Sequence, residues 1–222
     1  FRPSPSGDEN GVDLNDDSLY YNTQGSAKDY WKKNGPLPVP TKDISQLRHE
    51  FREFGYCLIE DAVSQEQLNT MRTRVVEQAA GERLAGVAFW YSGGAGTGKT
   101  THAQQFVTCL VNKGDCFRGF MEHDPSVVQG GPLIEQLVSE TVDPDFRIMS
   151  LLAIIANKGG HPQALHQDSG FFQTETPILA NHLVFLDNVN YWNGGTLIVP
   201  QSHKIMYEGG NHQPVGELPP AI

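Results

Sequence analysis

Apolar residues recur at three- and four-residue steps in two segments of the N-terminal half, a spacing that places them on one face of a helix. The first stripe comprises Ile44, Leu47, Phe51 and Phe54. Gly55 follows it directly, where helices commonly end in a left-handed residue. The second stripe comprises Leu68, Met71, Val75 and Ala79. It starts after Ser64 and Gln67, which have the spacing of a capping box, so we predict a second helix ending near Gly81.

The rest of the chain is dominated by shorter apolar runs of strand length, separated by Gly, Pro and Asn. These runs cover residues 87–91, 106–111, 148–156, 179–186 and 196–199. A short strand is also predicted at 56–60, between the two helices, and a third helix at about 132–139. Helices first and strands afterwards predict an α+β fold, because a regular βαβ protein would alternate the two.

Net charge and the lengths of the apolar runs indicate which kinds of partner the chain can have. The chain has 222 residues and a formal net charge of −10, from 16 basic and 26 acidic side chains. Nucleic-acid backbones and anionic membranes repel a surface of that sign, so neither is expected as the main partner. No apolar run approaches the roughly 20 residues that span a bilayer. We therefore expect a cytoplasmic protein.

The first 40 residues differ from the rest. They are rich in Pro, Gly, Ser, Asn and Asp, and bury too little apolar surface to offset the entropy of ordering. We predict a flexible or loosely docked tail over 1–40 and one domain over 41–222. Part of the tail could be pinned by aromatic residues, namely Tyr20, Tyr21, Tyr30 and Trp31. Cys57, Cys109 and Cys116 contain no C-x-x-C pair and are expected to be reduced, partly buried thiols.

His166 and Asp168 carry the strongest chemical signal. On a strand, side chains two residues apart point to the same face, so an imidazole and a carboxylate would meet at one point. A second histidine would complete the facial triad that binds ferrous iron and leaves positions for a co-substrate and dioxygen. Taken alone, the pair fits a surface His-Gln-Asp turn better than a metal site, because a chain with eight histidines can show it by chance.

Three patterns place this pair in a wider context. They read F-x-x-F-G-Y-C-L-I-E-D at 51–61, Q-x-x-H-Q-D at 163–168 and N-G-G-T-L-x-V-P-Q-S-H-K at 193–204. In this order they resemble the phytanoyl-CoA dioxygenase family of iron(II)- and 2-oxoglutarate-dependent oxygenases, over about residues 42–204.

The resemblance implies a double-stranded β-helix, or jelly roll, with the metal in its mouth and helices packed outside. It also implies Fe(II), 2-oxoglutarate and O₂, with oxidation of a small organic substrate coupled to decarboxylation of 2-oxoglutarate to succinate. His166 and Asp168 match the first two iron ligands of the family. Gln163 lies close to where some relatives contact the co-substrate. The substrate and the oligomeric state are not indicated.

Two expected features of the family are missing from the sequence. The strand with the distal iron-binding histidine does not occur before Ile222, and no arginine that could pair with 2-oxoglutarate follows Arg147. His203 and His212 are poor candidates for the third ligand. We therefore expect a fragment with an incomplete metal site, and the alternative is a non-catalytic module of the same fold.

A competing motif fits G-x-x-x-x-G-K-[ST] over residues 93–100. Gly93 and Gly98 would shape a phosphate-cradling turn, Lys99 would neutralise phosphates, and Thr100 would hold Mg²⁺. The motif follows a predicted strand and precedes a plausible helix from Thr101, and Asp187 could act as the metal-holding aspartate. A P-loop nucleotide-binding protein is thus an alternative function. We favour an accidental match, because the flanking sequence resembles the oxygenase family.

Overall fold

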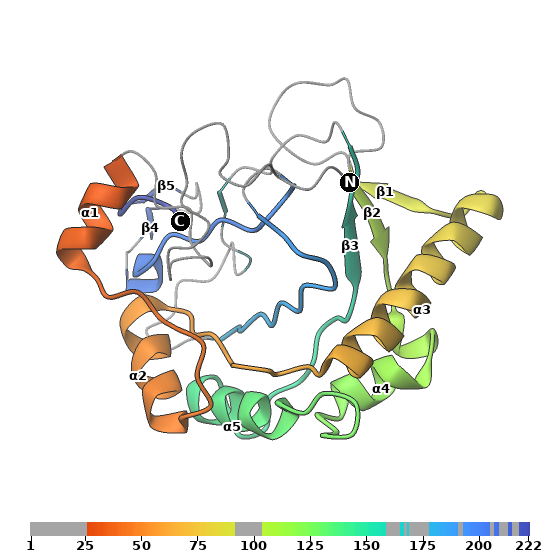
Figure 1. Cartoon of the computed structure of the whole chain (residues 1–222), viewed down its shortest axis with the longest axis horizontal. Helices are drawn as coiled ribbons and strands as arrows, with labels where there is room; N and C mark the ends of the chain where they lie inside the picture. Colours follow the sequence, from red (N-terminus) through yellow and green to blue (C-terminus); the bar gives the residue numbers. More distant parts are fainter. Residues whose placement is uncertain are drawn as a thin grey trace.

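The computed structural model describes residues 26–91, 104–158, 165–166, 168, 178–190, 193–204, 207–208, 213–214 and 218–222. Its main elements are five α-helices and one three-stranded sheet, and Figure 1 shows the helices following the outer edge of the molecule. The helices are α1 (Ser26–Asn34), α2 (Ile44–Phe54), α3 (Gln65–Leu84), α4 (Asp115–Met121) and α5 (Gly131–Thr141). The sheet contains β1 (Phe89–Tyr91), β2 (Gln104–Val107) and β3 (Ala153–Ala156).

The smaller elements lie between and after these. They are the 3₁₀ turns η1 (Leu110–Asn112) and η2 (Ser202–Lys204), and the two-residue strands β4 (Tyr207–Glu208) and β5 (Gln213–Pro214). β4 and β5 pair antiparallel with each other. Mixed helices and antiparallel strands make the described structure α+β, as the order of sequence patterns predicts.

Helices α2 and α3 are set by local signals that the sequence shows directly. Gly55 has φ 81° and closes α2 with its N–H on the Phe51 carbonyl at 3.0 Å. The Ser64 side chain accepts the N–H of Gln67, whose own side chain accepts the N–H of Ser64, so the predicted capping box is confirmed. The helix continues to Leu84, three residues beyond the predicted end. The predicted helix at 132–139 is confirmed as α5.

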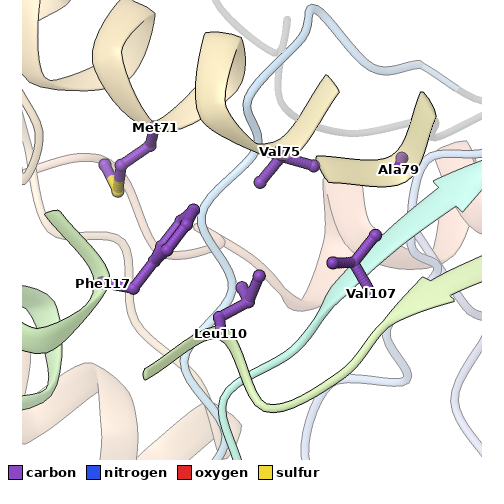
Figure 2. Packing of buried hydrophobic residues seen from close by; sticks show 6 residues of the cluster. All are labelled: Met71, Val75, Ala79, Val107, Leu110 and Phe117. Atoms are coloured by element: carbon purple, nitrogen blue, oxygen red, sulfur yellow. The ribbon is translucent and has the colours of Figure 1, made fainter. Parts of the chain in front are cut away.

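The main hydrophobic cluster joins α3 to the sheet. Met71, Val75 and Ala79 of α3 pack against three buried residues from other elements, shown in Figure 2. Those three are Val107 of β2, Leu110 of η1 and Phe117 of α4. Burial of these side chains fixes α3 on one face of the sheet, since each apolar contact there removes surface from water.

The sheet has two different faces. All its pairs are antiparallel, with Phe106 opposite Phe89 on one side and Ile154 on the other. Gln105 and Val107 are fully buried on the α3 side, and the Gln105 amide donates to the Ala79 carbonyl at 3.1 Å. The opposite face is mainly apolar, with Gln104 beside the aromatic and aliphatic residues, and it is partly open because Phe89 and Ile154 are each 53% exposed.

Strands were predicted less well than helices. Residues 56–60 form no strand, and their backbone pairing is a single parallel bridge between Thr41 and Ile59. The described residues of 179–186 and 196–199 are irregular, and the run predicted at 106–111 is divided between β2 and η1. These runs have the composition of strands, but ladder hydrogen bonds depend on partners far away in sequence.

The predicted flexible tail contains ordered structure. Helix α1 lies within it, and Trp31 is only 4% exposed and donates its Nε1–H to the Pro220 carbonyl at 3.0 Å. Trp31 shares a cluster with Tyr56 and Ile222, so this part of the tail is packed on the domain. Residues 1–25 lie outside the described residues.

The three cysteines are free thiols, as predicted. Cys57 and Cys116 are partly buried, whereas Cys109 is exposed, which corrects the expectation for that residue. Burial raises the pKa of the Cys57 thiol to about 12, so it stays protonated at neutral pH. In the part of the chain that the structure describes, no helix combines the length and apolar character needed to cross a bilayer.

Candidate functional site

His166 and Asp168 lie side by side. Nε2 of His166 is 3.2 Å from Oδ1 of Asp168, and the two side chains are 46% and 51% exposed. The sequence predicts this meeting of imidazole and carboxylate, but not the backbone that produces it. Residues 165–166 have no regular structure and Asp168 lies in a turn, so the expected strand is wrong for these described positions.

The spacing of the two donor atoms suits a shared metal ion. Two ligands that bind an octahedral ion at right angles, each about 2.1 Å away, are themselves about 3.0 Å apart. The observed 3.2 Å between Nε2 and Oδ1 is close to this separation. Imidazole and carboxylate are also the donor types of the iron facial triad, so these two residues fit ferrous iron.

Asn181 hydrogen-bonds the carboxylate of Asp168. Its amide Nδ2 donates a hydrogen bond to Oδ2 of Asp168, the oxygen that does not face His166. Sequence reasoning missed this residue. The sequence carries no local signal for it, because Asn181 is exposed and reaches Asp168 across 13 positions.

The described residues do not supply a third ligand. They contain no group of three or more His, Cys, Asp or Glu side chains close enough to hold a metal ion. Gln163, the candidate co-substrate contact, and His212 lie outside the described residues. The structure therefore brings together two of the predicted site residues and leaves the role of Gln163 as a prediction.

The His203 side chain binds the C-terminal end of α2. Its Nε2–H donates to the Arg52 carbonyl, with 2.8 Å between the two atoms. The ring lies against Gly55, where an added Cβ would come within 2.4 Å of Nδ1. The N–H of Gln201 donates to the Phe54 carbonyl at 2.8 Å, and Lys204 pairs with Glu53 at 2.9 Å.

These contacts give the S-H-K segment a structural role. The last carbonyls of a helix have no partner within the helix, and here two of them accept hydrogen bonds from residues 201–204. Burial lowers the pKa of His203, although the bond to the Arg52 carbonyl opposes this effect. With Nε2 bonded to the Arg52 carbonyl and Nδ1 lying against Gly55, His203 presents no open nitrogen to a metal ion.

A pair of histidines lies near the site. The rings of His123 and His182 have centroids 6.5 Å apart, and His123 is 9% exposed beside the ring of Phe146. Loss of hydration lowers the pKa of both imidazoles, and the proximity of His123 lowers that of His182 further. Neutral rings are therefore favoured here.

The structure contradicts the context that a P-loop requires. Gly93, Gly98, Lys99 and Thr100 lie outside the described residues, but the elements on either side are the antiparallel strands β1 and β2. A P-loop needs a helix after the glycine turn, and β2 occupies that place. Asp187, the supposed metal-holding residue, pairs with Arg72 of α3 at 2.7 Å and is not on a strand.

The sequence matches the model of a known protein family. The model of the phytanoyl-CoA dioxygenase (PhyH) family matches residues 51–214, more than half of the chain. A carboxylate and an imidazole held together on a mixed α+β scaffold are consistent with an oxygenase. The chain belongs to the phytanoyl-CoA dioxygenase family. Comparisons with curated proteins and with solved structures found no match.

Proposed function

We propose that this chain is a non-haem oxygenase that uses Fe(II), 2-oxoglutarate and O₂ to oxidise a small organic substrate. Membership of an oxygenase family supports the class of reaction. The observation that carries the proposal is the 3.2 Å separation between Nε2 of His166 and Oδ1 of Asp168. That spacing suits two adjacent ligands of one ion. It is also the length of an imidazole–carboxylate hydrogen bond, so the family match is what favours a metal here.

The chain's own residues would bind and orient the metal. His166 contributes a neutral donor and Asp168 a single negative charge, so Fe(II) on these two ligands keeps a net charge of about +1. That remaining charge favours an anionic co-substrate such as 2-oxoglutarate. When bound, iron and 2-oxoglutarate supply the oxidising power for C–H oxidation, with release of succinate and CO₂.

The proposed scaffold is a double-stranded β-helix to which the three-stranded sheet contributes. The sheet's apolar face, opposite α3, would be the inner face. Gly194 supports this arrangement, because a Cβ at this position would lie 3.3 Å from the Ala156 side chain on that face. With φ 97°, Gly194 also takes a conformation that suits glycine, which lets the Asn193-Gly-Gly turn approach β3.

Anaerobic titration with Fe(II) and 2-oxoglutarate tests the proposal. We expect a visible charge-transfer band, and succinate after air is admitted. His166→Ala and Asp168→Ala should each abolish both signals, whereas His203→Ala should retain them as the matched histidine control. Iron binding with no succinate would favour the non-catalytic module. The absence of both the band and succinate in the full-length protein would refute the proposed function.

A further inference from the structure

We propose that Asn181 is a positioning residue that fixes the orientation of the Asp168 carboxylate for metal binding. This inference rests on the proposed function, since it concerns the same site. The key contact is the hydrogen bond from Nδ2 of Asn181 to Oδ2 of Asp168. The other carboxylate oxygen, Oδ1, faces His166.

The two carboxylate oxygens of Asp168 therefore have different partners, Asn181 for Oδ2 and His166 for Oδ1. An ionised carboxylate only accepts hydrogen bonds, so the Asn181 amide must present its NH₂ group to Oδ2. Rotation of the carboxylate about its bond to Cβ would break that hydrogen bond. Oδ1 is thereby held toward Nε2 of His166, in the relative position that two adjacent ligands of one ion require.

Asn181 is itself held in place by its neighbours in sequence. Ala180 packs against the cluster formed by Val128, Ile134 and Val138, two of which belong to α5. On the other side, the His182 ring contacts the His123 ring. Contacts with the helical layer thus anchor the backbone on both sides of Asn181, so its amide reaches Asp168 from a supported position.

Residues that hydrogen-bond a metal ligand without touching the metal have a measurable effect on metal affinity. Removing a residue that hydrogen-bonds a ligand typically lowers metal affinity by about 10–100-fold. Asp168 is half-exposed, so without Asn181 its carboxylate could turn toward solvent and lose its alignment with His166. The loss should appear in metal affinity, because Asn181 has no direct role in binding the ion.

The test measures Mn²⁺ binding by paramagnetic broadening of backbone amide signals, which detects weak binding and locates it. Mn²⁺ accepts the same imidazole and carboxylate donors. In the wild-type chain, broadening should centre on residues 166, 168 and 181. Asn181→Leu removes the donor while keeping the branched shape, and it should raise the dissociation constant by about 10–100-fold. Asn181→Ala should do the same without any risk of overpacking.

Asn69→Leu is the matched control. Asn69 is an exposed amide on α3 that accepts a hydrogen bond from Gln65, and its loss should leave Mn²⁺ affinity unchanged. The melting temperature of each metal-free variant shows whether it is folded. Wild-type affinity in folded Asn181→Leu and Asn181→Ala would overturn the role of Asn181 and leave the metal site standing. No broadening around His166 in the wild type would overturn the metal site as well.

Discussion

Two short histidine-containing segments of this chain have similar chemistry in sequence and different surroundings in the fold. His166, in 165–168, faces the carboxylate of Asp168 and is 46% exposed. His203, in 201–204, donates to a backbone carbonyl and lies against Gly55. A carboxylate with an imidazole beside it suits a cation, whereas a helix-end carbonyl needs only a donor. The acceptor next to each ring therefore distinguishes His166, a candidate metal ligand, from His203, which has a structural role.

The largest expected effect on stability comes from Gly55→Ala, which disturbs the contact between residues 201–204 and the end of α2. Alanine at φ 81° costs about 1–2 kcal/mol of folding free energy. Its Cβ would also come within 2.4 Å of Nδ1 of His203, and such overpacking costs about 1–3 kcal/mol more. Urea unfolding should show a total loss of about 2–5 kcal/mol.

Gly81→Ala is the control for that substitution. Gly81 lies inside α3, and an added Cβ would meet no atom within 4 Å. Alanine should therefore raise the free energy of unfolding by about 0.5–1 kcal/mol. An equal loss of stability in both variants would show that the contact between Gly55 and His203 has no special importance.

His203→Ala should have the next largest effect. It leaves the exposed Arg52 carbonyl at the end of α2 without its protein donor, at a cost of about 0.5–1.5 kcal/mol in the free energy of unfolding. Metal binding at His166 should be unchanged. A variant with wild-type stability and lost metal binding would reverse the roles assigned to the two histidines.

A smaller effect is expected from pH. Burial holds the pKa values of His123, His182 and His203 below the ordinary value of about 6.5. The unfolded chain therefore takes up protons at a higher pH than the folded one, so stability is complete above about pH 6.5 and falls as pH drops below it. Urea unfolding at pH 5.5 and 7.5 measures the difference.

The contribution of His203 to that pH dependence can be isolated. His203→Ala should reduce the difference in stability between the two pH values, because one of the three perturbed imidazoles is gone. A wild-type stability that stays constant or rises as pH falls through this window would contradict the neutral state assigned to these rings.

The smallest effect should come from Lys204→Ala. The ion pair between Lys204 and Glu53 spans 2.9 Å, but the side chains are 46% and 49% exposed. Water and salt screen such a pair, so the loss of stability should be smaller than for His203→Ala and should disappear in 1 M NaCl. A loss that persists at high salt would assign Lys204 a packing role instead.

The sequence predicts the helical part of the fold because its signals are local. Gly55 at the end of α2 and the Ser64–Gln67 box at the start of α3 act within one turn of the chain. Strands at 179–186 and 196–199 were predicted from composition alone and are absent from the described residues there. Strand pairing depends on distant partners, and one sequence does not reveal them.

The same difference between local and distant contacts applies to the candidate site. His166 and Asp168 are two positions apart, so their meeting could be predicted from the chain itself. Asn181 reaches Asp168 across 13 positions, and His203 reaches Arg52 across 151. These two contacts exist only because α2, α5 and the segment 178–204 fold together. Tertiary structure thus decides which polar residues support the site.

The most direct measurement compares Fe(II) affinity in His166→Ala and His203→Ala by anaerobic calorimetric titration. Loss of a direct ligand should weaken binding by at least about 100-fold, more than the loss of an outer partner. We predict that loss for His166→Ala and wild-type affinity for folded His203→Ala. Retained affinity in His166→Ala, or equal losses in both variants, would contradict a metal centre built on His166 and Asp168.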